Sequence, residues 1–138
     1  MAIIGTHNEQ GAYPLIAFQL SQTWACPVAM DAIVYVIGAG GSGAALGPAH
    51  SGSYNARGGA AGGCAVSRLS LAAQNYTVTI GSGGASVESG HSTDGAAGGN
   101  SVFSGTGITT MTANGGAAGT KSSSAQNVTT GGGTATGG

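Results

Sequence analysis

The chain has 138 residues and a net charge of −1, and charged residues make up only 5% of it, against about a quarter of an average soluble domain. Glycine, alanine, serine and threonine, with 29, 24, 15 and 14 copies, fill most positions. This composition argues against an enzyme, which needs several converging ionisable groups. Three basic residues also argue against a surface that neutralises nucleic-acid phosphates.

Residues 1–30 differ in composition from the rest of the chain, because they hold only two glycines and several large apolar side chains. Apolar and polar residues alternate from Ile16 to Trp24, which predicts one strand that Pro27 ends. We interpret residues 1–22 as an N-terminal attachment or assembly segment. Residues 23–138 are then a glycine-rich β domain with a low-complexity C-terminal end.

Two further strands are predicted at residues 31–37 and 76–80, and each runs into a Gly-x-Gly-Gly phrase. A Gly-Gly phrase follows in both cases, and a weaker third copy begins at Ile108, so the chain reads as an imperfect repeat. Residues 65–74 show a weak helical period, but Arg68-Leu-Ser-Leu71 equally fits a strand.

Glycine at this density suits two structures: positive-φ turns between strands, or extended polyproline II-type helices that lie side by side. No Gly-X-Y triplet runs through the chain, which excludes collagen. We therefore expect a mainly β, sandwich-like fold with long glycine loops and some polyglycine II-type packing. Because bulky side chains are few, we expect neighbouring copies to supply order, as a homo-oligomer and in particular a trimer.

The sequence Gly38-Ala-Gly-Gly-Ser-Gly43 matches the G-x-G-x-x-G fingerprint of dinucleotide-binding turns and follows an apolar strand. That fingerprint also requires a helix after the third glycine and an acidic residue about 20 positions later. Ala44-Ala-Leu-Gly-Pro48 does not favour a helix, and the first acid beyond the motif is Glu88. We expect no cofactor here.

Metal and nucleophile chemistry have little support. His91 and Asp94 form a metal half-site at best, and no Ser lies in a nucleophile elbow. Cys26 and Cys64 lack CxxC spacing, so we expect two small buried thiols and no metal.

Aromatic, histidine and amide side chains on glycine-rich loops can stack on and hydrogen-bond to sugars or protein epitopes. Ordinary loop residues are the simpler interpretation of the same pattern. The candidate receptor-contact residues are His50, Tyr54, Asn55, His91, Asn100 and Asn114.

The first residues lack the basic and apolar regions of a secretory signal, and the longest apolar run is far shorter than a bilayer span. We expect synthesis in the cytoplasm and no membrane span. Residues 129–138 end in low complexity without a predicted closing strand, so we expect more chain or a partner to follow.

The ordered phrases resemble the glycine-rich domain of bacteriophage tail fibres and tail-tip adhesins over about residues 23–119. The matching phrases are Thr23-Trp-Ala-Cys-Pro27, Ile33-Val-Tyr-Val-Ile-Gly-Ala-Gly-Gly-Ser-Gly43, Gly58-Gly-Ala-Ala-Gly-Gly63, Tyr76-Thr-Val-Thr-Ile-Gly-Ser-Gly-Gly84 and Gly98-Gly-Asn-Ser-Val-Phe103. The resemblance implies a mainly β domain on virion fibres that attach to tails and bind host surface molecules, with no catalytic residue to carry over.

The sequence therefore predicts a non-enzymatic virion protein, a tail fibre or tail-tip component, whose partners are other tail or baseplate proteins and a host surface glycan or protein. An extracellular or cell-surface glycine-rich filament is the alternative. A nucleotide-binding enzyme is the third hypothesis, which depends on the G-x-G-x-x-G match alone.

Overall fold

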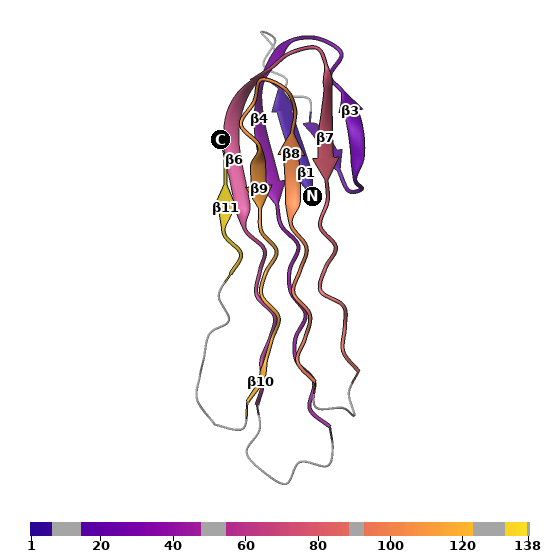
Figure 1. Cartoon of the computed structure of the whole chain (residues 1–138), viewed down its shortest axis with the longest axis vertical. Coiled ribbons are helices and arrows are strands. Elements are labelled where there is room, and N and C mark those ends of the chain that lie inside the picture. The colour runs from indigo at the N-terminus through magenta and orange to yellow at the C-terminus, as the bar shows by residue number, and fades with distance from the viewer. Residues whose placement is uncertain (7–14, 48–54, 89–92, 123–131, 138) are drawn as a thin grey trace.

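The computed structural model describes residues 1–6, 15–47, 55–88, 93–122 and 132–137. Every regular element in these residues is a strand, as the sequence predicts. All described strands except β5 and β10 gather at one end of an elongated molecule, and glycine-rich segments run side by side from them to the other end, where β5 and β10 pair (Figure 1). The strands are β1 Ala2–Thr6, β2 Leu15–Phe18, β3 Gln22–Ala25, β4 Met30–Ile37, β5 Asn55–Ala56, β6 Cys64–Leu71, β7 Asn75–Thr79, β8 Ser101–Ser104, β9 Met111–Ala113, β10 Lys121–Ser122 and β11 Ala135–Thr136.

Two antiparallel sheets form a sandwich. One has the strand order β2-β1-β4-β6 and the other β11-β9-β8-β7-β3, while β10 and β5 pair separately. Side chains from both larger sheets meet in one apolar core. Its members are Ala2, Ile4, Phe18, Cys26, Ala32, Val34, Val36, Ala65, Leu71, Tyr76, Val78, Phe103, Met111 and Ala113.

Strand β4 shows why the sequence folds this way. Ala32, Val34 and Val36 are buried, whereas Ile33 and Tyr35 between them are exposed. Successive side chains of a strand point to opposite faces, so this alternation places one face in the core. The predicted strands at 31–37 and 76–80 are confirmed as β4 and β7, which begin and end within one residue of the prediction.

Aromatic rings close the core beside β3. Tyr76 and Phe103 stack with ring centroids 5.3 Å apart, and Trp24 lies 5.9 Å from Tyr76. The Tyr76 hydroxyl accepts a hydrogen bond from the Ala72 N–H at 2.9 Å and donates to the Ala72 carbonyl at 3.3 Å. The ring is therefore buried without leaving its polar end unsatisfied.

The prediction of one strand over residues 16–24 is wrong. The structure divides this stretch into β2 and β3, which lie in different sheets. Phe18 on β2 and Trp24 on β3 still pack together, with centroids 5.9 Å apart. A crossing from one sheet to the other keeps inward apolar residues on both strands, so alternation alone cannot distinguish it from one continuous strand.

Residues 1–22 contribute strands to the sandwich. Strand β1 lies between β2 and β4, and its Ala2 and Ile4 are fully buried. An attachment role for residues 1–22 stays a prediction.

Three other expectations are settled by the described strands. Residues 64–71 form strand β6, so the strand alternative is confirmed over the helical one. Cys26 is buried as expected, but Cys64 is exposed, because Ala65 takes the inward position at this end of β6. A closing strand does exist: β11 pairs with β9, although low complexity hid it in the sequence.

The glycine-rich segments form a bundle joined by backbone hydrogen bonds that recur every third residue. From residues 38–44, the N–H groups of Gly38, Gly41 and Ala44 donate to the carbonyls of Gly63, Ala60 and Arg57, each at 2.9 Å. The N–H groups one position later, at Ala39, Ser42 and Ala45, donate to the carbonyls of Gly99, Ala96 and Thr93 instead. The backbone therefore rotates by one third of a full turn per residue, so that every third N–H points to the same neighbouring segment. Three residues per turn is the period of a polyproline II-type helix, whereas a strand has a period of two.

The φ angles decide between the two structures that the glycine density allowed. Among the described residues, only Gly107 and Gly137 have positive φ, and no residue other than glycine does. Three residues per turn with negative φ is the polyproline II geometry. The expectation of polyglycine II-type packing is confirmed, and positive-φ turns are rare.

Glycine is required at every third position because the segments touch backbone to backbone. Five segments carry Gly-x-x-Gly, and a Cβ on either glycine would approach a neighbouring carbonyl oxygen closer than real atoms do. These glycines are Gly38 and Gly41, Gly59 and Gly62, Gly81 and Gly84, Gly95 and Gly98, and Gly116 and Gly119. The neighbours in these contacts are segments of the same chain. A homo-oligomer stays a prediction.

Two adjacent glycines provide a matched test of this packing. A Cβ at Gly84 would meet the Ala96 carbonyl and the Ser42 nitrogen, whereas a Cβ at Gly83 would have no atom within 4 Å. We expect Gly84→Ala to lower the free energy of unfolding by about 1–3 kcal/mol, and Gly83→Ala to change it by less than about 1 kcal/mol. Urea unfolding followed by circular dichroism measures both, and equal losses would contradict the close approach.

Candidate functional site

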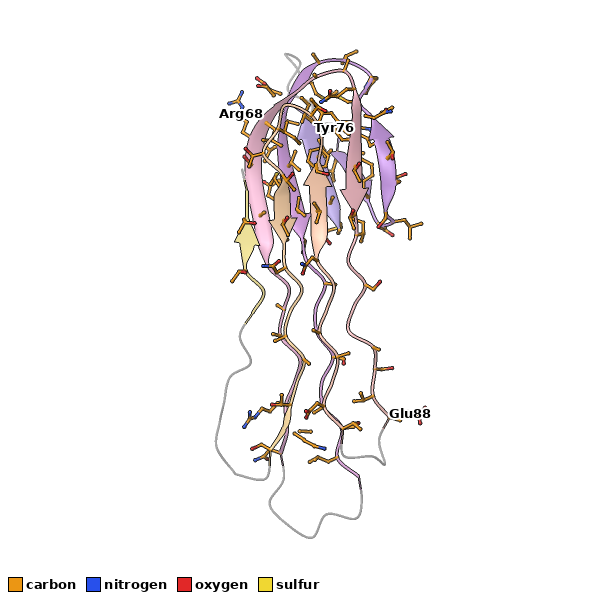
Figure 2. All side chains as sticks on the ribbon, viewed as in Figure 1. Arg68, Tyr76 and Glu88 are labelled. Atoms are coloured by element: carbon orange, nitrogen blue, oxygen red, sulfur yellow. The ribbon has the colours of Figure 1, made fainter. Side chains whose placement is uncertain are left out.

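Charged side chains collect at the end of the bundle away from the sandwich, which we call the distal end. Of the seven charged residues, Arg57, Glu88, Asp94 and Lys121 lie there, and Figure 2 shows Glu88 in this position. Between them and the sandwich, the described bundle segments contain only small or apolar residues and amides. Among the described residues of the bundle, charged side chains therefore occur only at the distal end.

Backbone pairing fixes the positions of these charges. Strand β5 pairs with β10, with Ala56 opposite Lys121, and an isolated bridge joins Ala45 to Thr93. The Gly95 N–H donates to the Gly119 carbonyl at 2.8 Å. Four segments of the chain thus meet at the distal end with defined registers.

Side-chain hydrogen bonds join the same segments. The Asp94 carboxylate accepts a hydrogen bond from the Lys121 backbone N–H at 2.7 Å. The Arg57 guanidinium donates to the Thr120 hydroxyl at 3.3 Å. Asp94 and Arg57 therefore brace the bundle and still present charge to solvent.

The structure does not bring the six predicted receptor-contact residues together. His50, Tyr54 and His91 lie outside the described residues. Asn55 begins β5 at the distal end, where it is exposed. Asn100 and Asn114 lie at the opposite end of the bundle, directly before β8 and directly after β9.

Asn100 and Asn114 tie segments together beside the sandwich. The Asn100 side-chain carbonyl accepts a hydrogen bond from the Gly115 N–H at 2.9 Å. The Asn114 side-chain amide donates to the Thr134 hydroxyl at 2.7 Å. These contacts give both residues a structural role, and a receptor contact by either stays a prediction.

Sequence reasoning missed the charged residues of the distal end. They are far apart in the chain, and no motif links them. A usable signal exists all the same, because Arg57, Asp94 and Lys121 each lie within two residues of a Gly-x-x-Gly segment or its flanking glycine. A charge at the margin of such a segment marks where the bundle ends.

The G-x-G-x-x-G match at residues 38–43 belongs to a bundle segment. A dinucleotide-binding turn offers free N–H groups to a pyrophosphate at a helix N-terminus. Here the N–H groups of Gly38, Ala39, Gly41 and Ser42 all donate to carbonyls of neighbouring segments. These four N–H groups are therefore not available to bind a pyrophosphate.

In the part of the chain that the structure describes, no three His, Cys, Asp or Glu side chains gather as metal ligands. The Asp94 carboxylate of the predicted half-site instead accepts the Lys121 N–H. Nor do the described residues contain a helix long and apolar enough to cross a bilayer.

A second charged group lies on the outer face of the sandwich. The Ser70 hydroxyl donates to the Asp31 carboxylate at 2.6 Å, and the Arg68 guanidinium lies 3.5 Å from the other carboxylate oxygen. The Ser70 hydrogen bond is the main cause that lowers the pKa of Asp31; loss of hydration opposes it, and the nearby Arg68 guanidinium adds to the lowering.

We expect Ser70→Ala to raise the pKa of Asp31 towards its ordinary value. A lowered folded-state pKa stabilises the protein above the unfolded-state pKa, and this contribution is lost as the pH falls through the folded-state pKa. The variant should therefore lose less stability on acidification than the wild type. An NMR titration of the Asp31 carboxyl measures the shift, with Ser104→Ala on the other sheet as control. An unchanged pKa would contradict the role of Ser70.

Asn100 offers a test of the bracing hydrogen bonds. We expect Asn100→Ala to lower the free energy of unfolding by about 0.5–1.5 kcal/mol, because the Gly115 N–H loses its acceptor. Asn100→Asp keeps an acceptor oxygen and should retain most of the stability. Urea unfolding of the two variants decides the matter, and equal losses would show that the side-chain carbonyl is not the stabilising group.

Comparison with known proteins gives one match. A family model described as a glycine-rich domain matches residues 17–138. No curated protein and no solved structure matches the chain.

Proposed function

The chain belongs to the glycine-rich domain family, and from this premise we propose that it is a non-enzymatic structural protein of a bacteriophage virion, a tail fibre or tail-tip component that serves assembly and host attachment. The observation that supports the proposal is the distal end, where a hydrogen-bonded bundle holds chemically distinct residues far from the β-sandwich (Figures 1 and 2). Such an arrangement is suited to presenting the residues of the distal end to a host surface.

The bundle presents its end with little freedom to move. Its segments are joined at every third residue by backbone hydrogen bonds, and glycine leaves no side chain between them. A rigid support reduces the entropy that a loop loses when it binds a surface. The sandwich at the other end is the natural place for assembly with tail or baseplate proteins.

The candidate contact residues follow from chain connectivity. Residues 48–54 connect Gly47 to Asn55 at the distal end, and residues 89–92 connect Glu88 to Thr93. His50, Tyr54 and His91 fall in these intervals. We propose that they, with Asn55, contact a host surface glycan or protein, and that many weak contacts add up through effective concentration on one particle.

Location tests the virion assignment. An antibody against the chain should label purified particles at the tail in electron microscopy, with particles from a deletion strain as control. Labelling of the cell envelope in place of particles would overturn the assignment and favour the cell-surface filament.

Competition tests the attachment role. We expect the purified chain, added in excess, to reduce particle adsorption to host cells. Tyr54→Ala and His91→Ala should weaken this competition by about tenfold or more if each removes a stacking or hydrogen-bonding contact. Thr77→Ala on the outer face of the five-stranded sheet is the matched control. Unchanged competition by all variants would show that these residues do not form the contact.

A further inference from the structure

Among the residues that the structure describes, β6 is the longest edge strand of the sandwich. It has eight residues, whereas the other edge strands have four in β2, four in β3 and two in β11. An edge strand presents unpaired N–H and C=O groups along its length. Of the edge strands with described positions, β6 therefore has the largest set of open backbone groups.

The hydrogen-bond pattern shows which residues of β6 point outward. Ile37 and Met1 exchange backbone hydrogen bonds at 2.9 and 3.1 Å, so Ile37 faces β1 and its neighbour Val36 faces β6. Hydrogen-bonded and non-hydrogen-bonded pairs alternate in an antiparallel ladder. With Val36 opposite Ala65, the inward-bonded residues of β6 are those at 65, 67, 69 and 71.

The residues at 64, 66, 68 and 70 therefore direct their N–H and C=O groups to the free edge. In the described part of the chain, no backbone hydrogen bond reaches these four residues from any element. Eight strong hydrogen-bonding groups lie in a row, which is costly only if something covers them without pairing them.

Strand β6 also lacks the features that usually protect an edge. It contains no proline and no lysine, and its eight residues pair with β4 without a bulge. Val66 on its outer face is 51% exposed, beside the exposed Ile33 and Tyr35 of β4. Its one charge, Arg68, is already opposed by Asp31, so the edge has no net charge that would repel another copy.

We propose that β6 pairs antiparallel with β6 of a second copy of this chain, with the two-fold axis at Ser67. In this register Cys64 lies opposite Ser70 of the other copy, and Val66 lies opposite Arg68. All four outward residues of both copies are then hydrogen-bonded, and the two four-stranded sheets become one sheet of eight strands. A second copy fits this edge because β6 is a regular strand of equal length, and a two-fold axis at Ser67 pairs every outward group of one copy with an outward group of the other.

The inference goes beyond the proposed function and does not depend on it. It also specifies a dimer in place of the trimer that the sequence predicts, because antiparallel edge pairing closes after two copies.

The mass in solution is the first test. Sedimentation equilibrium should give twice the 12.9 kDa chain mass. Arg68→Pro removes an outward N–H in both copies and should weaken the dimer by about tenfold or more. Thr23→Pro is the control, because Cys26 bonds towards β7 and Thr23, three residues earlier, faces the other free edge. A single-chain mass, a trimer, or equal effects of the two prolines would overturn the proposal.

Register-specific cross-linking is the second test, and it does not depend on the stability of a proline variant. In the proposed register Cys64 and residue 70 of the other copy have Cα atoms about 5.5 Å apart, within reach of a disulfide. Mild oxidation of Ser70→Cys should give a covalent dimer. The wild type, whose Cys64 residues lie far apart in this register, and Thr77→Cys should not. No covalent dimer from Ser70→Cys, or equal amounts from Thr77→Cys, would overturn the proposed pairing.

Discussion

The structure depends on one constraint: between the core and the distal end, the two layers of the sandwich approach each other until their backbones hydrogen-bond directly. Within the sandwich, side chains such as Phe103 and Val34 separate the layers, as stacked sheets usually require about 10 Å. In the bundle, the segment after β4 donates to the segment before β8, which continues the opposite layer. Only a residue without a Cβ permits this approach, so the glycine pattern follows from the convergence.

The sandwich sets the register of the bundle. Val36 pairs with Ala65 on β4 and β6, and the Gly38 N–H then donates to the Gly63 carbonyl in the same register. The register of β8 and β9 likewise continues into the bond from Gly98 to Gly116. A segment of small residues has no side-chain pattern to prevent slippage. The core therefore aligns the strands, and the aligned strands place each glycine opposite the carbonyl that needs it.

The parts of this fold that the sequence predicts are those with a local pattern. Strict alternation predicts β7, a run rich in Ile, Val and Tyr predicts β4, and the density of glycine allows the polyproline II-type bundle. The Gly-x-x-Gly spacing is visible at 59–62, 95–98 and 116–119, but its partners are not, since each segment bonds to others tens of residues away. The division into β2 and β3, the exposure of Cys64 and the grouping of Arg57 with Asp94 and Lys121 all depend on that long-range pairing. No local pattern in the sequence indicates which segments pair.

The same constraint limits where this protein can vary. A side chain larger than hydrogen at Gly41 or Gly98 would displace a neighbouring backbone, so these positions cannot acquire recognition chemistry without loss of the bundle. Positions between the two glycines of a Gly-x-x-Gly segment, such as Ala61 and Ala97, face outward and are exposed, but each is surrounded by small residues. Where the bundle ends, side chains from several segments can gather without disturbing the backbone contacts. At the distal end, Arg57, Asp94 and Lys121 flank the glycine segments, so their side chains are present while the backbone contacts between the layers stay intact.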